Sequence, residues 1–150
     1  MNGWILAAAV EIGGAGTAAL WGVTTGAPGR RVVAQNMTTS ALCPALLLLS
    51  QGYGRPAYVD LALLLALLGP IGTLVFARLL SDELERERPS AWGLTWTAAA
   101  LSAVVVAAVC VPTGPGRAMV KLLVIGALLI TGNVIASRAL SGGFQGVRGG

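Results

Sequence analysis

The stretch RVVAQNMTTSALCPALLLLSQGYGRPAYVDLALLLALLGPIGTLVFAR, residues 31–78, decides the fold of this 150-residue chain. It holds one apolar run over residues 32–50 and the beginning of a second that covers residues 58–80, with a short turn of Gly, Pro and Tyr between them. Each run is close to the ~20 residues that a helix needs to cross a hydrocarbon core of about 30 Å. The stretch therefore predicts two transmembrane helices joined by a tight turn.

Polar side chains interrupt both runs. Gln35 and Asn36 lie inside the first run, and Asp60 lies near the start of the second, where the helix dipole favours a negative charge. At helical spacing Asn36 shares one face with Thr39, Ser40 and Cys43, and Pro44 follows directly. Such a stripe suits a helix that lines a hydrated path, and it equally suits hydrogen bonding between packed helices.

The polar landmarks of this stretch carry a family resemblance. Over about residues 15–88 the chain resembles the F subunit of the multi-subunit Mrp-type sodium/proton antiporter. The matching elements are Arg31-Val32-Val33-Ala34, Asn36, Tyr58-Val59-Asp60-Leu61-Ala62-Leu63, Gly72-Thr73 and Ala77-Arg78.

This resemblance implies a small accessory subunit that works inside a complex. Relatives carry an intramembrane Asp where this chain has Asn36, and an Asp at the position of Asp60. An amide can coordinate water or a cation, but it cannot take up or release a proton. We therefore expect Glu11, Asn36 and Asp60 to be the candidates for an ion path.

The C-terminal part begins after the polar segment SDELERERP, residues 81–89, which we expect to be solvated and to mark a boundary. Two further apolar runs follow, at residues 93–111 and 119–137. The second weakly resembles the last helix of the antiporter's G subunit through Lys121, Thr131-Gly132 and Arg138, with Asn133 where that family has Pro. We expect an F-like membrane domain over residues 1–90, a two-helix G-like segment over 91–140, and a flexible tail over 141–150.

Composition sets the class of protein. Hydrophobic residues make up 55% of the chain, charged residues 11%, and the mean hydropathy is +0.78, which indicates an all-α integral membrane protein. The net charge of +4 comes mostly from basic residues that flank the apolar runs. In this position basic residues set the orientation of membrane helices, so we do not expect nucleic-acid binding. With no histidine in the chain, we expect no enzyme activity, no metal site and no cofactor. Cys43 and Cys110 lie in apolar runs without metal-site spacing, and we expect them to serve packing.

The first predicted span, residues 4–24, contains Glu11. A charge near the bilayer centre costs at least about 2.5 kcal/mol, so Glu11 either handles protons or cations or is kept neutral or hydrogen-bonded by the surrounding helices. Gly14, Ala18 and Gly22 recur at i+4 and form a small-residue ridge on which another helix can pack, and we expect the same use for Gly72.

The distribution of basic residues predicts the topology. With five alternating spans, seven basic residues fall on one side and three on the other, which places the amino terminus outside and the carboxyl terminus in the cytoplasm.

Two functions remain open. The first is a small accessory subunit of a multi-subunit monovalent cation/proton antiporter in the cell membrane, with the other subunits and the lipid bilayer as partners and with Na⁺ and H⁺ as candidate transported ions. The second is a self-sufficient small transporter or channel, assembled as a homo-oligomer, in which Glu11 couples transport.

Overall fold

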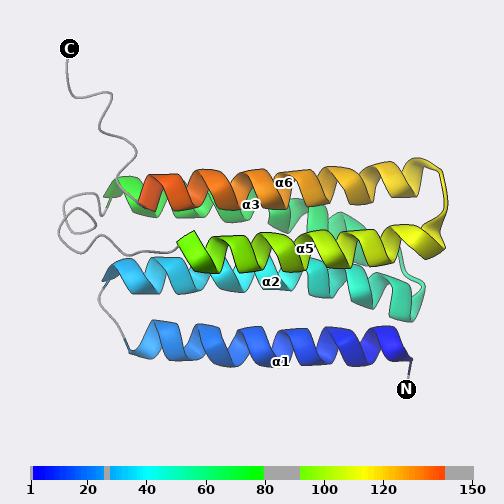
Figure 1. Ribbon diagram of the computed structural model, residues 1–150, viewed down its shortest axis with the longest axis horizontal. Helices are drawn as coiled ribbons and strands as arrows, with labels where there is room; N and C mark the ends of the chain where they lie inside the picture. The colour runs from blue at the N-terminus through cyan, green and yellow to red at the C-terminus, as the bar shows by residue number, and fades with distance from the viewer. Residues whose placement is uncertain (1, 26–27, 80–91, 141–150) are drawn as a thin grey trace, which may run out of the picture.

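The computed structural model describes residues 2–25, 28–79 and 92–140 (Figure 1). The polar segment at 81–89 and the tail at 141–150 lie outside the described residues. The described residues form helices and contain no strand. In chain order the helices are α1 (Gly3–Thr24), α2 (Pro28–Tyr53), α3 (Ala57–Leu79), α5 (Trp92–Thr113) and α6 (Arg117–Leu140).

All five helices are long and apolar enough to cross a membrane, which confirms the all-α class and the five expected spans and makes the chain a multi-pass membrane protein. The α2–α3 turn holds Gly54 at φ 62° and the α5–α6 turn holds Gly114 at φ 68°, a backbone region that favours glycine. Pro112 lies inside α5, which continues to Thr113, two residues beyond the apolar run expected from the sequence.

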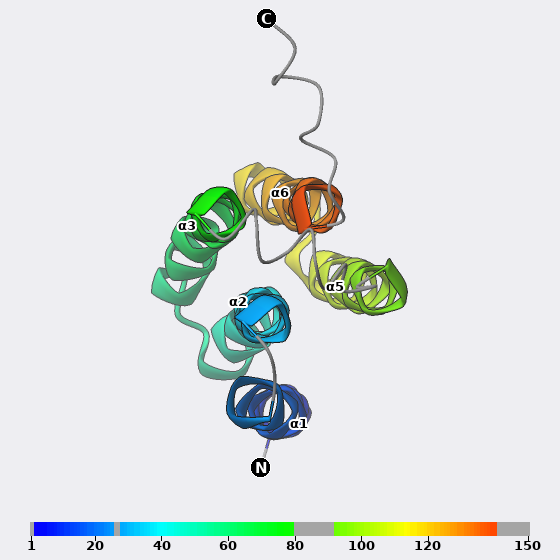
Figure 2. The ribbon, with the colours of Figure 1, turned by 90° about the vertical axis from the view of Figure 1, so that its left-hand side faces the viewer.

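The most polar helix, α2, occupies the centre of the bundle. Viewed from the end, α1 lies on one side of α2, while α3, α6 and α5 surround its other side (Figure 2). In the most apolar stretch of α2, within Arg31–Tyr53, 56% of the residues are buried inside the bundle. The corresponding share in α1 is 11%. The fold therefore places the polar stripe of α2 among other helices and leaves α1 as the most peripheral element.

Small residues set how closely the helices approach. A Cβ atom at Gly22 would overlap Ala34, and one at Gly52 would overlap Ile5, so these two contacts fix the antiparallel register of α1 and α2. On the other side of α2, Gly69 of α3 packs against Thr39. In α6, Gly132 packs against the ring of Pro70 in α3, and Gly126 packs against Val106 in α5. These glycines let the backbones come close, which is the common basis of helix association in membranes.

The two ends of the bundle differ in charge among the described residues. Because consecutive helices run antiparallel, Arg31, Arg78 and Arg138 share one end, called here the Arg31 end (Figure 1). Asp60 and three basic residues, Arg55, Arg117 and Lys121, lie toward the opposite end, called the Lys121 end. The orientation of these ends relative to the cell stays a prediction.

Candidate functional site

Four buried polar side chains meet between α2, α3 and α6, and this cluster is called here the polar junction. Thr73 Oγ1 donates a hydrogen bond of 3.0 Å to Asn36 Oδ1. Asn36 Nδ2 donates at 3.3 Å to Asn133 Oδ1, and Ser40 Oγ donates to the same oxygen at 2.6 Å. Helix α2 thus contributes Asn36 and Ser40, α3 contributes Thr73, and α6 contributes Asn133.

The junction is shielded from its surroundings. All four residues are buried, and Asn133 is only 3% exposed. Side-chain hydrogen bonds between membrane helices contribute about 0.6 kcal/mol on average and up to about 1.7 kcal/mol. A buried group that loses its partner costs more, about 1 to 3 kcal/mol. The junction therefore specifies which helices pair and in which register.

Local sequence explains how the junction is built. Asn36 and Ser40 are four residues apart, so both point from the same face of α2. Thr73 follows Pro70, which lies inside α3 and whose ring packs on Gly132 of α6. Gly132 immediately precedes Asn133 in the sequence. The close contact of Gly132 with α3 therefore places the Asn133 side chain within hydrogen-bonding distance of Asn36.

Three members of the stripe on α2, Asn36, Ser40 and Cys43, hydrogen-bond to neighbouring helices, one of the two uses that the sequence left open. Thr39 instead donates to Gln35 O within α2. The last member of the stripe, Cys43, is buried, and its thiol donates to the Ala62 carbonyl of α3 at 3.2 Å. Both cysteines are free thiols, and Cys110 is half-buried.

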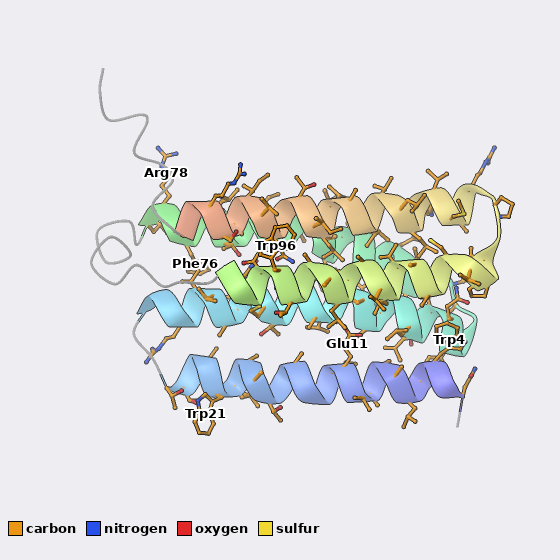
Figure 3. All side chains as sticks on the ribbon, viewed as in Figure 1. Trp4, Glu11, Trp21, Phe76, Arg78 and Trp96 are labelled. Atoms are coloured by element: carbon orange, nitrogen blue, oxygen red, sulfur yellow. The ribbon has the colours of Figure 1, made fainter. Side chains whose placement is uncertain are left out.

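Glu11 lies apart from the polar junction, on α1 (Figure 3). The register fixed by Gly22 and Gly52 puts it at the level of Ala45 in α2, in the middle part of the bundle. Its side chain is half-buried, and its Oε1 atom is buried without a hydrogen-bond partner among the described residues. The described residues therefore supply no hydrogen-bond donor to this oxygen.

The ridge that follows Glu11 is only partly used by the chain. Gly22 packs against Ala34, whereas Gly14 and Ala18 are exposed and a Cβ atom at Gly14 would meet nothing within 4 Å.

Asp60 lies in the first turn of α3 and pairs with Lys121 of α6, Oδ1 to Nζ at 3.0 Å. The two side chains are 60% and 55% exposed, so the pair contributes at most about 1 kcal/mol. The three candidates Glu11, Asn36 and Asp60 thus lie at three separate places rather than in one site. The sequence identified each residue but not the partners Asn133 and Lys121, although both are polar groups inside or beside an apolar run.

A pocket of about 180 Å³ lies beside the polar junction, between α2 and α3. It is called here the α2–α3 groove, and its walls include Val32, Gln35 and Thr39 of α2 and Leu65, Gly72 and Phe76 of α3. A Cβ atom at Gly72 would meet nothing within 4 Å, so Gly72 borders this open space instead of packing on a neighbouring helix of the chain.

Metal-binding groups do not gather in the described part of the chain, where no three His, Cys, Asp or Glu residues come together.

The part of the sequence that forms the centre of the bundle matches a known family model. Residues 30–81 match the family model of Multiple resistance and pH regulation protein F (MrpF / PhaF). The match confirms the resemblance to the F subunit that the sequence indicated. No curated protein and no solved structure matches the chain.

The MrpF / PhaF match covers most of α2 and all of α3, and with them Asn36, Ser40, Thr73 and Asp60. Glu11 and Asn133 lie outside it. The match ends at residue 81, so the expected likeness of residues 91–140 to the G subunit is not supported. The polar junction therefore joins the matched part to a helix beyond it.

Proposed function

We propose that this chain is a small accessory subunit of a multi-subunit monovalent cation/proton antiporter complex in the cell membrane. The observation that carries the proposal is the MrpF / PhaF match over residues 30–81, which coincides with the two helices that build the centre of the fold. Na⁺ and H⁺ are the ions that the complex would exchange. We propose no catalytic site for the chain, and the buried side chains of Asn36, Ser40, Thr73 and Asn133 bind one another.

Within this function Asn36 would hold α2, α3 and α6 together. Its amide donates to Asn133 and accepts from Thr73, so both ends of the side chain are engaged. An amide does not take up or release a proton at neutral pH. The described spans hold one acidic residue away from their ends, Glu11, and we assign to it any proton- or cation-handling duty of this chain.

A partner subunit would cover the outer flank of α1. Gly14 and Ala18 are exposed there, and Glu11 lies one turn away with a buried carboxylate oxygen that no described group of the chain binds. A helix from another subunit can approach the backbone closely at Gly14 and supply a hydrogen-bond donor or a cation to the part of the half-buried Glu11 carboxyl group that the chain leaves exposed. This arrangement would satisfy a group that is costly in lipid.

Purification from native membranes tests the proposal. A tagged chain should co-elute with large apolar membrane subunits, identified by mass spectrometry. Gly14→Leu should reduce this co-elution, because the new side chain occupies the approach to α1. Gly116→Ala is a matched control, because this residue lies in the α5–α6 turn with nothing within 4 Å of a Cβ atom. Recovery of the chain without any other subunit would contradict the proposal.

The second candidate function is a self-sufficient homo-oligomeric transporter or channel. The unpartnered carboxylate of Glu11 favours it as well, because a second copy of the chain could face that residue. Proteoliposomes that contain the purified chain alone separate the two functions. Cation-dependent proton flux that disappears in Glu11→Gln would support the transporter and rule out the accessory subunit.

A further inference from the structure

Two buried polar atoms beside the polar junction have no hydrogen-bond partner among the described residues. They are Nδ2 of Asn133 on α6 and Oγ of Ser102 on α5. Both residues are almost fully buried, Asn133 at 3% and Ser102 at 1% exposure. A buried polar group without a partner is costly, so nearly all such groups in folded proteins bond either the protein or an ordered water molecule. The two atoms therefore mark a place where a small polar ligand would be bound.

The packing of α5 against α6 brings these two atoms close together. Gly126 of α6 packs against Val106 of α5, and the two helices run antiparallel (Figure 1). Counted from this contact toward the Arg31 end, Ser102 lies four residues along α5 and Asn133 lies seven residues along α6. These spacings are close to one and two helical turns, so both side chains keep the direction of the contact, at about 6 Å and about 10 Å from it. Ser102 and Asn133 therefore lie on facing sides of the two helices, about 4 Å apart in depth.

Helix α2 reaches the same place. Gln51 Nε2 of α2 donates a hydrogen bond of 3.3 Å to Thr113 Oγ1 of α5, and these two helices run parallel (Figure 1). Ser40 lies eleven residues before Gln51, and Ser102 lies eleven residues before Thr113, so the two serines share one depth. Ser40 also binds Asn133. The three side chains therefore gather between α2, α5 and α6, which are neighbours in the bundle (Figure 2).

The orientation of the Asn133 amide decides what kind of ligand can bind there. Its Oδ1 accepts from both Asn36 Nδ2 and Ser40 Oγ, and these two donors hold the amide in one orientation. Its Nδ2 then offers N–H donors, so the ligand must accept a hydrogen bond. A bare cation cannot accept one.

The same place also offers acceptors. Pro44 has no N–H, so the Ser40 carbonyl does not receive the usual helix hydrogen bond from the residue four positions on. The hydroxyl oxygens of Ser40 and Ser102 can accept as well. A simple anion could bind the donor of Asn133, but it has no proton to donate to these oxygens. Water both accepts and donates, and buried water molecules typically make about three hydrogen bonds to polar groups that otherwise lack partners.

We infer that one water molecule is bound between α2, α5 and α6, where it accepts from Asn133 Nδ2, bonds the Ser102 hydroxyl and donates to an oxygen of Ser40. This water would connect α5 to the polar junction of α2, α3 and α6. Ser102 and Asn133 both lie beyond the part that matches the MrpF / PhaF family, and the inference does not depend on the proposed transport function.

Solid-state NMR of the full-length chain in lipid bilayers tests the inference. The asparagines of the chain are Asn2, Asn36 and Asn133, so isotope labelling of asparagine gives few side-chain amide signals, and Asn133→Leu identifies the one that belongs to Asn133. In the wild type, the Asn133 amide protons should show a cross-peak to a bound water molecule. Ser102→Val should lose this cross-peak, because its methyl groups take the place of the hydroxyl and of the water.

Ser50→Ala is the matched control for variants of Ser102. Ser50 is a buried serine of α2, and its hydroxyl donates to Leu47 O of the same helix. This variant should keep the cross-peak between Asn133 and water. Circular dichroism should show Ser50→Ala and Ser102→Val to be folded.

The thermal stability of Ser102→Ala is a second readout. If the Ser102 hydroxyl had no partner in the folded protein, its removal would relieve a buried polar group and raise the midpoint of thermal unfolding. A hydroxyl that bonds a water held by Asn133 and Ser40 stabilises the fold instead, so we expect Ser102→Ala to lower the midpoint. Ser50→Ala should change it little, because the Leu47 carbonyl also accepts the helix hydrogen bond of α2.

Several outcomes would overturn the inference. Absence of a cross-peak between Asn133 and water in the folded wild type would remove the water, and its persistence in folded Ser102→Val would place the water elsewhere. A higher unfolding midpoint in Ser102→Ala would show that the hydroxyl has no partner. A crystal structure with Ser102 Oγ bonded directly to Asn133 Nδ2 would leave no place for the water. Anomalous signal at this place in crystals grown with rubidium bromide would assign it to an ion.

Discussion

Asn36 of α2 donates a hydrogen bond of 3.3 Å to Asn133 of α6, across 97 positions of sequence. The first residue belongs to the part that matches the MrpF / PhaF family and the second lies beyond it. Together with the contact of Pro70 with Gly132, this bond makes α6 a packing partner of the matched helices. The boundary expected near residue 90 is therefore a boundary of sequence likeness, and the helices on its two sides pack into one bundle.

Removal of the Asn133 amide should destabilise the bundle. Asn133→Leu keeps the branching of the side chain, but it deprives Asn36 Nδ2 and Ser40 Oγ of their shared acceptor. We expect a loss of about 1 to 3 kcal/mol in unfolding free energy. Thermal or denaturant unfolding in detergent, followed by circular dichroism, measures it. Thr131→Val, at an exposed position of the same helix, is the control, and an equal stability of the two variants would refute the role of the junction.

A carboxylate at position 36 should be tolerated where an apolar residue is not. In Asn36→Asp the carboxylate can still accept from Thr73, and the Asn133 amide can turn its Nδ2, which has no partner among the described residues, toward the new oxygen. Asn36→Leu leaves the Thr73 hydroxyl and Asn133 without their bonds to residue 36. We therefore expect Asn36→Asp to yield folded protein at wild-type levels and Asn36→Leu to reduce the yield and the stability. Yield of monodisperse protein by size-exclusion chromatography is the measure, and the reverse ranking would show that residue 36 does not depend on its hydrogen bonds.

The Asp60–Lys121 pair should matter little for stability. Both side chains are more than half exposed, so Asp60→Asn should change the unfolding free energy by at most about 1 kcal/mol. The exchanged pair, Asp60→Lys with Lys121→Asp, should restore most of any loss. If Asp60→Asn instead abolishes cation exchange by the assembled complex while stability stays unchanged, Asp60 has a role in transport beyond its ion pair.

The fold was predictable because transmembrane helices can be recognised from the length and apolarity of their sequences. All five spans and their order follow from the positions of the apolar runs in the sequence. The close-contact glycines were less predictable. Of the glycines expected to pack, Gly22 does approach a neighbouring helix, whereas Gly14 and Gly72 do not. The sequence did not single out Gly52, Gly69, Gly126 and Gly132, which also approach a neighbouring helix.

Only the α2 residues of the polar junction could be predicted from the sequence to lie together. The spacing of Asn36 and Ser40 showed that they share a face, because helical geometry fixes relations within about two turns. It could not show that Asn133 completes the cluster, since the pairing of distant helices depends on the packing of Pro70 against Gly132. The same limit applies to Lys121, whose partner Asp60 is set by the register of α3 with α6.

The membrane orientation can be tested by cysteine labelling. Gly52 is unsuitable for a probe because a side chain there would overlap Ile5, so the α2–α3 turn is best probed at the exposed Arg55. In a background without the native cysteines, Arg55→Cys should react with a membrane-impermeant maleimide in intact cells. Leu79→Cys, at the exposed end of α3, should react only after permeabilisation. The opposite pattern would invert the orientation derived from the basic residues.

Glu11→Gln separates a transport role from a structural one. The carboxyl group is half-buried, and its Oε1 has no partner in the described part of the chain, so a neutral amide of the same shape should leave stability unchanged or raise it. A proton- or cation-handling residue would nevertheless be lost, because the amide cannot titrate. We therefore expect the assembled complex with Glu11→Gln to retain all its subunits and to lose most cation-dependent proton flux in everted membrane vesicles. Thr17→Val, two turns along the same helix at an exposed position, should retain the flux. Wild-type flux in Glu11→Gln would make the chain a structural member of its complex, and dissociation of the complex in Glu11→Gln would mean that the carboxylate binds a partner subunit.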